Sequence, residues 1–419
     1  MILLVFASSY PYDAQREETF LDPEMPHMLS RFEKVILVPK IREGKRLAVP
    51  PEVEVDESYA GFLETVNKFS TLLKVLFSSC FYRDVFKNPF IWTKPSALLR
   101  LVTYVGGARL TQEWVEKWFA RSGYNDSECV FYTFWFDAAA FGIGLAKQRY
   151  PDLKVVSRAH GYDVYEDRYP VHYLPCRPQA FACSDGVFTD SAAGAGYLQA
   201  RFPAYRSKIE PALMGVPDPG FLTKASDDGV FRLVSCAIIR PVKRVDLLLE
   251  GIAEAARQRP ELRFEWHHFG NSEVEGVREA LQARAENILP PNARACLPGY
   301  QGQQELFRHY RKKPVDVFVN VSVSEGTPVS SMEAASCGIP VISTAVGGNK
   351  EMVNAKNGFL LDANPSAQEI AETFFLMIDH PEKIAEMRTA SRAVWQEKYN
   401  SEKNLKKFFN GLKIFRESK

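Results

Sequence analysis

The chain has 419 residues, of which 46% are hydrophobic and 25% charged, and its 52 basic and 51 acidic side chains give a net charge of +1. This composition is typical of a folded globular protein, and the length exceeds what one hydrophobic core usually covers, so we predict two domains. The near-zero net charge gives nucleic acid no electrostatic reason to bind and argues against that class of partner.

Seven cysteines are scattered singly along the sequence. Their odd number and the absence of any Cys-x-x-Cys spacing argue against a disulfide framework and a zinc site, and favour a reducing compartment. The apolar segment 1–7 has no basic residues before it and is cut off by the polar Ser8 and Ser9. We therefore interpret it as a first β-strand and not as a signal peptide.

Short apolar runs alternate with longer helix-like stretches, which is typical of parallel sheets covered by helices. The Pro/Gly-rich stretch 214–221 is predicted to be a linker, after which the alternation starts again. The sequence thus predicts an α/β protein of two doubly wound domains joined near residue 216, with strand ends facing each other across a ligand cleft. The predicted strands are 2–7, 34–38, 130–135, 154–158 and 186–189 in the first half, and 232–236, 263–269, 295–297, 315–319 and 340–343 in the second.

Residues 60–120 interrupt this alternation with apolar side chains at helical spacing, many of them aromatic. Basic residues are interleaved, so no uncharged run approaches the ~20 residues that a membrane span needs. One interpretation is an amphipathic helical insertion packed on the sheet. The alternative is a helix pair that enters a membrane surface to meet a lipid-borne acceptor, which a basic cluster at 40–46 weakly favours.

Two glutamates mark the most informative stretch, 319–343, which is predicted to be a strand, a loop, a helix starting near Pro328 and a second strand. Glu325 lies in the loop, and Glu333 follows eight residues later in the helix. The unpaired amides at the helix start favour an anion, while the carboxylates can accept hydrogen bonds from sugar hydroxyls. This combination fits a nucleotide-sugar, although Glu325 as a helix cap and Glu333 as a solvated helix residue remain the alternative.

Two cations follow the predicted strand 232–236. Arg240 and Lys243 fall near the carboxyl end of that strand, where open α/β sheets bind ligands. Cations there can neutralise a diphosphate and stabilise the charge that builds on it as a glycosidic bond breaks. The alternative is a solvated loop.

Together these motifs resemble glycosyltransferase family 4, the retaining group with the GT-B fold. The resemblance rests on Arg240-x-x-Lys243-x-x-Asp246, on Glu325-x7-Glu333 and on Gly338-Ile-Pro-Val-Ile. The resemblance covers nearly the whole chain. Four further motifs are similar to those of polysaccharide- and lipopolysaccharide-biosynthesis members, namely Ser9-Tyr-Pro-Tyr, Glu18-Thr-Phe-Leu, His160-Gly-x-Asp163 and Asp190-Ser-Ala-Ala-Gly.

The resemblance implies an organisation for the chain. Residues 1–215 would form an acceptor-binding Rossmann-like domain that carries the helical insertion 60–120. Residues 216–395 would form the nucleotide-sugar-binding Rossmann-like domain. A C-terminal helix, 396–419, would return to the first domain.

The resemblance also implies roles. Arg240 and Lys243 would hold the donor diphosphate, Glu325 the transferred sugar and Glu333 the ribose. His160 would project toward the reaction centre, with a buried structural histidine as the alternative. The other implied donor-side residues are Gly299, Tyr300, Gly326, Thr327, Pro328 and Val329, and the acceptor-side residues are Tyr10, Tyr12, Arg16 and Asp163.

One departure concerns the loop after the first strand. Many family members have a Gly-Gly pair there, but the loop 10–18 contains no glycine. This departure argues against phosphate contacts from the backbone of this loop, and Arg16 is the candidate to replace them.

The sequence contains no Asp-x-Asp triplet, so a divalent-metal clamp has no evident ligands and we expect no metal cofactor. The family implies a retaining transfer from a UDP- or GDP-linked sugar to a glycan, carried on a polyprenyl diphosphate, in bacterial surface polysaccharide biosynthesis. That implies a cytoplasmic enzyme with peripheral contact at the inner membrane. Three alternatives stay open: a catalytically silent partner subunit, another sugar-nucleotide enzyme such as an epimerase, and a sugar-binding protein.

Overall fold

The computed structural model describes residues 1–15, 17–326 and 328–414. It divides into two compact units. The first is Met1–Ala212 together with the C-terminal segment from Leu405, and the second is Leu213–Asn404. The chain leaves the first unit three residues before the expected boundary at residue 215.

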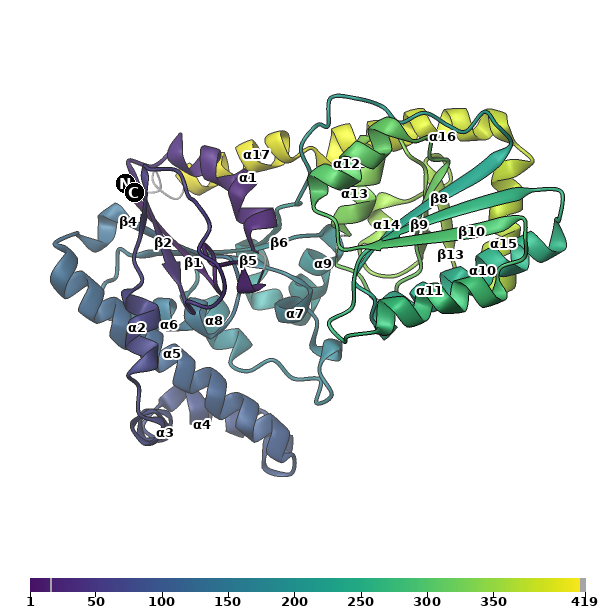
Figure 1. The fold of residues 1–419 in the computed structure, drawn as a ribbon. Coiled ribbons are helices and arrows are strands. Elements are labelled where there is room, and N and C mark those ends of the chain that lie inside the picture. The colour runs from purple at the N-terminus through teal and green to yellow at the C-terminus, as the bar shows by residue number, and fades with distance from the viewer. Residues whose placement is uncertain (16, 327, 415–419) are drawn as a thin grey trace. The chain divides into compact units, whose positions relative to one another are not determined.

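The first unit is built on one parallel sheet (Figure 1). Its strands are β1 (Ile2–Ala7), β2 (Lys34–Pro39), β3 (Val53–Val55), β4 (Cys129–Thr133), β5 (Lys154–Ala159), β6 (Gly186–Thr189) and β7 (Ile209–Pro211). They lie in the order β3-β2-β1-β4-β5-β6-β7, and every neighbouring pair is parallel. The order reverses between β1 and β4, so the carboxyl ends of these strands form the topological switch point.

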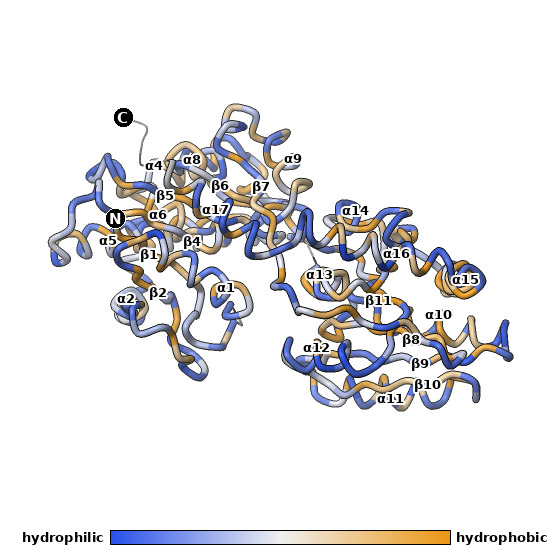
Figure 2. The backbone as a smooth tube through the Cα atoms, turned by 90° about the horizontal axis from the view of Figure 1, so that it is seen from above, coloured by the Kyte–Doolittle hydropathy of each residue, from blue (hydrophilic) through white to orange (hydrophobic). Residues whose placement is uncertain are grey.

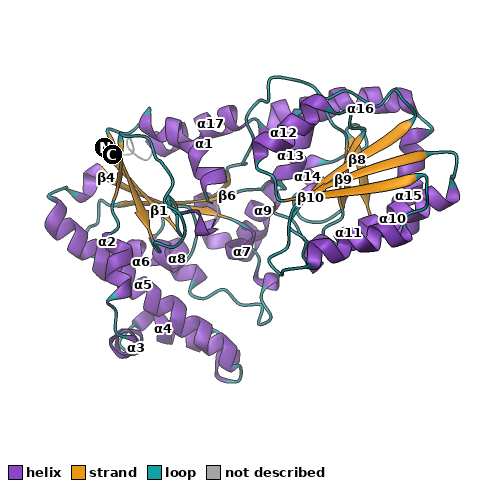
Figure 3. Cartoon of the chain, in the orientation of Figure 1, coloured by secondary structure: helices purple, strands orange, loops and turns teal. Residues whose placement is uncertain are grey.

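Helices cover both faces of this sheet (Figure 3). They include α17, whose Leu405, Phe408, Phe409 and Leu412 join the core formed by β1, β2 and β4. The C-terminal helix therefore packs as part of the first unit. The helices are α1 (Glu18–Leu29), α2 (Ser58–Glu64), α3 (Lys68–Leu76), α4 (Ser79–Lys87), α5 (Pro95–Ser122), α6 (Ala138–Ala146), α7 (Gly161–Val164), α8 (Arg177–Cys183), α9 (Ala192–Arg201) and α17 (Ser401–Ile414).

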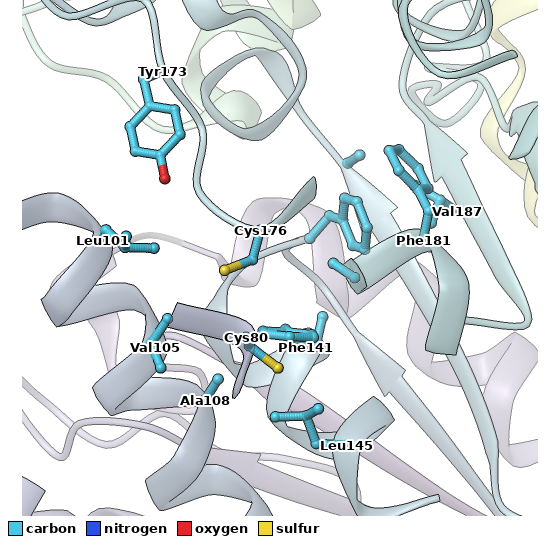
Figure 4. Close-up of a cluster of buried hydrophobic side chains, with 14 of the residues drawn as sticks. Cys80, Leu101, Val105, Ala108, Phe141, Leu145, Tyr173, Cys176, Phe181 and Val187 are labelled. Carbon is cyan, nitrogen blue, oxygen red and sulfur yellow. The ribbon is translucent and has the colours of Figure 1, made fainter. Parts of the chain in front are cut away.

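The segment that interrupts the alternation folds as α2–α5, and its inner side belongs to the core of the first unit. Figure 4 shows Cys80 of α4 and Leu101 and Val105 of α5 in one cluster with Phe141 of α6. Helix α3 packs on α5 where a Cβ atom on Gly106 would lie 2.9 Å from Thr71 Cγ2. The close approach of α3 to α5 therefore depends on glycine at this position.

The second unit repeats the architecture with a six-stranded parallel sheet. Its strands lie in the order β10-β9-β8-β11-β12-β13, and the switch point falls between β8 and β11. The strands are β8 (Val230–Cys236), β9 (Arg263–Phe269), β10 (Ala293–Gly299), β11 (Val317–Asn320), β12 (Val341–Thr344) and β13 (Gly358–Leu361). The helices are α10 (Val245–Gln258), α11 (Val277–Ile288), α12 (Gln303–Lys312), α13 (Val329–Ser336), α14 (Asn349–Met352), α15 (Ala367–Ile378) and α16 (Pro381–Val394).

Hydrophobic stretches run through the middle of each unit, and hydrophilic loops lie at the periphery (Figure 2). The prediction of two doubly wound α/β domains is confirmed, and each predicted strand is present within a few residues of its expected bounds. Strands β3, β7 and β13 were not predicted, because each has only three or four residues and lies at an edge of its sheet. Within the described residues, no helix combines the length and the apolar character needed to cross a membrane.

Candidate active site

The switch point of the second unit brings together two residues that are 82 positions apart in the sequence. Lys243 ends a short 3-10 turn (Pro241–Lys243) after β8, and Glu325 lies in the loop after β11. Lys243 Nζ donates to Glu325 Oε1 at 2.6 Å, and Asn320 Nδ2 donates to the same oxygen at 3.1 Å. Glu325 is buried and Lys243 is partly exposed, so the pair places a cation at the surface above a buried carboxylate.

The loop that carries Glu325 is held in place by Arg244. This residue adopts a left-handed backbone conformation (φ 48°), which starts α10 directly after Lys243. Its guanidinium donates to the carbonyl oxygens of Val321 at 2.7 Å, Ser322 at 3.1 Å and Ala363 at 2.8 Å. Arg244 therefore ties the two loops of the switch point together, and sequence reasoning missed it because its partners are distant carbonyl groups.

Gly347 allows the backbone of its own loop to pack closely against the loop that carries Glu325. Gly347 has φ 45°, and a Cβ atom there would lie 1.8 Å from the carbonyl oxygen of Glu325. The next residue, Gly348, donates its N–H to the Gly326 carbonyl at 2.9 Å. Only glycine permits this approach, so the position of Glu325 depends on a residue outside its own loop.

Glu333 is buried in α13. Gln303 Nε2, at the start of α12, donates to Glu333 Oε1 at 2.7 Å. Burial raises the pKa of the Glu333 carboxyl group to about 7, and the hydrogen bond from Gln303 opposes this shift only in part. The alternative of a solvated Glu333 is wrong, and Gln303 is a second residue that sequence reasoning missed.

The other residues predicted to lie on the donor side follow the carboxyl ends of β8, β10 and β11, which are on one edge of the sheet. Exposed Arg240 pairs with Glu273. Gly299 ends β10 with φ 85°, and Tyr300 follows it at the surface. Helix α13 begins at Val329, with Pro328 as its N-cap residue and Gly326 in the loop before it, while Thr327 lies outside the described residues.

His160 is at the corresponding edge of the first unit, directly after β5. Its Nε2 lies 3.1 Å from the Phe134 carbonyl, and its Nδ1 lies 3.5 Å from an Asp190 carboxylate oxygen. Burial lowers the pKa of His160, but the hydrogen bond and charge of Asp190 outweigh it, so the pKa lies above the ordinary value. The ring also packs between Phe134 and Trp135, with centroids 4.6 and 4.8 Å away. Both ring nitrogens therefore have partners within the unit.

Asp163 is buried as well and fixes the loop around His160. Its carboxylate accepts from the backbone N–H of His160 and, at 2.6 Å, from that of Phe136. Burial raises the pKa of Asp163 to about 6. These contacts are with the backbone of its own unit.

The loop after β1 is organised by Glu17, another residue that sequence reasoning missed. The buried Glu17 carboxylate accepts from the backbone N–H groups of Ser8 at 2.9 Å, Ser9 at 2.8 Å and Tyr10 at 3.1 Å, and from Trp135 Nε1 at 2.7 Å. The backbone amides that could otherwise bind a phosphate are thus used by an internal anion.

The three remaining residues predicted to lie on the acceptor side are the two tyrosines and the arginine near this loop. Tyr10 is buried, with its hydroxyl donating to Asp22. The Tyr12 hydroxyl donates to Glu57 at 2.8 Å. Arg16 lies outside the described residues.

No group of three or more His, Cys, Asp or Glu side chains in the described ranges is arranged to hold a metal ion. The switch point of the second unit brings together carboxylates, cations and the amides at a helix start. Carboxylates can bind sugar hydroxyls, and cations and helix-start amides can bind phosphates. The chemistry of this edge therefore matches a ligand that carries both.

Comparisons with known proteins agree with this chemistry. Residues 223–394 match the family model described as glycosyl transferases group 1. The colanic acid biosynthesis glycosyltransferase WcaL of Escherichia coli (strain K12) is 28% identical over 253 residues, which are 58% of this chain and 60% of that protein. The D-inositol 3-phosphate glycosyltransferase of Pseudarthrobacter chlorophenolicus is 26% identical over 219 residues, 49% of this chain and 50% of that protein.

The chain thus spans half to three-fifths of the length of these curated relatives. The structure of the lipopolysaccharide outer core galactosyltransferase WaaB in its apo form has a TM-score of 0.69 and 15% sequence identity, with 98% of this chain and 99% of that one covered. At this identity the likeness shows a common fold. Residues 223–394 thus match the group 1 glycosyltransferase family, and the two Rossmann-like units have the GT-B fold.

Proposed function

We propose that the protein is a metal-independent, retaining glycosyltransferase that uses a UDP- or GDP-linked sugar. The observation that carries the proposal is the Lys243–Glu325 pair at the switch point of the second unit, with Glu333 on the adjacent helix. Lys243 would contact the donor diphosphate together with Arg240, whose side chain is exposed. Glu325 would accept from the transferred sugar and Glu333 from the ribose.

The chemical step would break the bond between the anomeric carbon of the sugar and the oxygen of the diphosphate. A bond to the acceptor oxygen would form on the same face of the sugar, and the acceptor proton would pass to the departing phosphate oxygen. The negative charge on the diphosphate would be met by Lys243, Arg240 and the helix-start amide of Val329. Ionic and amide groups can fulfil this task without a metal ion.

The acceptor is proposed to be a glycan on a polyprenyl diphosphate, in the biosynthesis of a bacterial surface polysaccharide. Support comes from the relatives, which are named for colanic acid biosynthesis and for the lipopolysaccharide outer core. The first unit would bind this acceptor. The reaction would take place at the cytoplasmic face of the inner membrane.

The test is a transfer assay on the full chain, in the presence of a metal chelator, with UDP- and GDP-sugars and a polyprenyl-diphosphate glycan. The product is identified by mass spectrometry, and its anomeric configuration by NMR. Transfer with retained configuration is expected. Inverted configuration, or transfer that needs added metal, would contradict the mechanism. Tight donor binding without transfer to any acceptor would support a silent partner subunit instead.

A further inference from the structure

Exposed apolar side chains are concentrated in one short part of the chain. Among the described residues, nine of the seventeen large hydrophobic side chains that are exposed lie between positions 69 and 99. The most exposed aromatic ones are Phe77 at 83%, Phe86 at 78%, Phe69 at 67% and Trp92 at 65%. Figure 1 shows that α3, α4 and the first turns of α5, which carry this segment, project from the sheet of the first unit. Large rings gathered in this way mark an interaction site.

Helix α3 has its more apolar face outward. The side that packs on α5 presents Thr71 and Val75 to Gly106. The opposite side carries Phe69, Leu72, Leu73 and Leu76, at helical spacing and all exposed. A surface helix of a water-soluble domain normally shows the reverse pattern, so the core of the first unit does not account for this face.

Helix α4 has the usual polarity but still exposes aromatic rings. Cys80, Phe81 and Val85 enter the core, whereas Tyr82 and Phe86 are exposed. Phe81 therefore has a structural role. The aromatic residues available for an interaction are those on the outer side.

The charge of this segment is one-sided. Residues 66–100 contain six basic side chains, and the single acidic one, Asp84, is buried and accepts from Tyr173. Lys68, Arg83, Lys87 and Lys94 are exposed, and none of them forms an ion pair within the described residues. We refer to these four cations, with Phe69, Phe77, Phe86 and Trp92, as the aromatic–basic surface.

We propose that the aromatic–basic surface binds a lipid bilayer that contains anionic lipids. The aromatic rings would enter the boundary between headgroups and acyl chains, and the cations would contact the headgroup phosphates. Phe77 also lines a groove between α3 and α5, about 400 Å³ in volume, to which α5 contributes Glu113 and Glu116. The surface ends at this groove, where Glu113 is paired with Lys74. The proposal rests on the proposed function, because a lipid-linked acceptor requires the enzyme to work at a bilayer.

A bilayer fits these residues better than a protein partner or a second copy of the chain. Protein interfaces are depleted in lysine at their core, whereas three of the four cations here are lysines interleaved with the rings. Interfacial membrane elements combine aromatic side chains with Lys and Arg. A second copy would bring the same positive charge against this one, which is unfavourable.

The experiment is co-sedimentation of the full chain with vesicles of phosphatidylcholine, with and without phosphatidylglycerol. The wild-type protein is expected to bind the anionic vesicles and to be released by high salt. Phe77→Ser/Phe86→Ser should weaken binding by about tenfold or more, because two exposed rings no longer enter the bilayer. Lys87→Glu should weaken binding to anionic vesicles by at least about fivefold. The matched control is Val274→Ser/Leu376→Ser, which removes two exposed apolar side chains from the second unit and should bind like the wild type.

Vesicle binding that is equal in all variants, or equal for neutral and anionic vesicles, would overturn the proposal. A change in the mass of the protein in solution on Phe77→Ser/Phe86→Ser, measured by light scattering, would identify a protein interface instead. Titration of UDP and GDP onto the same variants separates the two claims. Loss of vesicle binding with intact nucleotide binding supports the surface, whereas vesicle binding by a protein that binds no nucleotide contradicts only the proposed function.

Discussion

Replacing Glu333 by glutamine is predicted to stabilise the protein and weaken its binding of a nucleotide. In the folded chain the pKa of this buried carboxyl group is raised to about 7, whereas the pKa of an ordinary glutamate is 4.5. The folded state therefore binds the proton more tightly than the unfolded state does. At roughly 1.4 kcal/mol per pKa unit, the difference corresponds to at most about 3–4 kcal/mol.

The sign of the effect depends on pH. Below pH 4.5 the group is protonated in both states and leaves the free energy of unfolding unchanged. Between pH 4.5 and about 7 only the unfolded state ionises, so stability falls as pH rises, and above 7 the full loss is present. Glu333→Gln removes this loss, because its amide stays neutral and can keep the contact with Gln303.

Two measurements test this reasoning. Chemical unfolding at several pH values should show a gain in the free energy of unfolding for Glu333→Gln that is near zero below pH 4.5 and reaches at most about 3–4 kcal/mol above pH 7. Calorimetric titration above pH 7, where the Glu333 carboxyl group is ionised, should show about tenfold weaker binding of UDP or GDP to Glu333→Gln, because a charge-assisted hydrogen bond to the ribose is lost. Glu386→Gln, on the exposed side of α16, is the matched control and should change neither quantity. A gain that is the same at all pH values, or unchanged nucleotide affinity, would refute the reasoning.

Three further predictions concern the site and the first unit. Gly347→Ala should displace Glu325, because the added Cβ atom would lie 1.8 Å from the Glu325 carbonyl oxygen. Calorimetry should then show nucleotide affinity lowered at least about tenfold, and wild-type affinity would contradict the packing argument. Arg158→Ala leaves the buried carboxylate of Glu24 without its ion-pair partner, which lies 2.8 Å away, and chemical unfolding should show a loss of about 3–5 kcal/mol. A loss below about 1 kcal/mol would show that the pair is dispensable. Arg240→Ala, at an exposed position, should leave the melting temperature unchanged but lower kcat/KM for transfer about tenfold or more, and unchanged kcat/KM would remove it from the site.

The fold is predictable from the sequence because each sheet strand is a short apolar run between turn residues. Strands such as β1 and β6, buried along their whole length, match their predicted bounds. The strand β3 shows the limit, since its three residues alternate between buried Val53 and exposed Glu54 at the sheet edge. Such a short segment carries too little apolar character to stand out from a loop.

The candidate site is predictable as a set of residue types, but not as a set of contacts. Spacing singled out Lys243, Glu325 and Glu333, and the switch-point topology then brings the first two together. Arg244 and Gln303 act on these residues through partners dozens of positions away, which no local pattern shows. In the same way, periodicity cannot tell exposed Phe77 from buried Phe81, because the difference depends on which face of each helix the core covers.

The central claim is that the second unit binds a nucleoside diphosphate through Lys243 without a metal ion. Calorimetric titration of UDP and GDP onto wild-type protein and Lys243→Ala, with a chelator present, tests it most directly. One of the two nucleotides should bind the wild type, and Lys243→Ala should weaken it about tenfold to a hundredfold, since a charged hydrogen bond contributes about 1.5–3 kcal/mol. Failure of both nucleotides to bind the wild type, or equal affinity in Lys243→Ala, would contradict the claim.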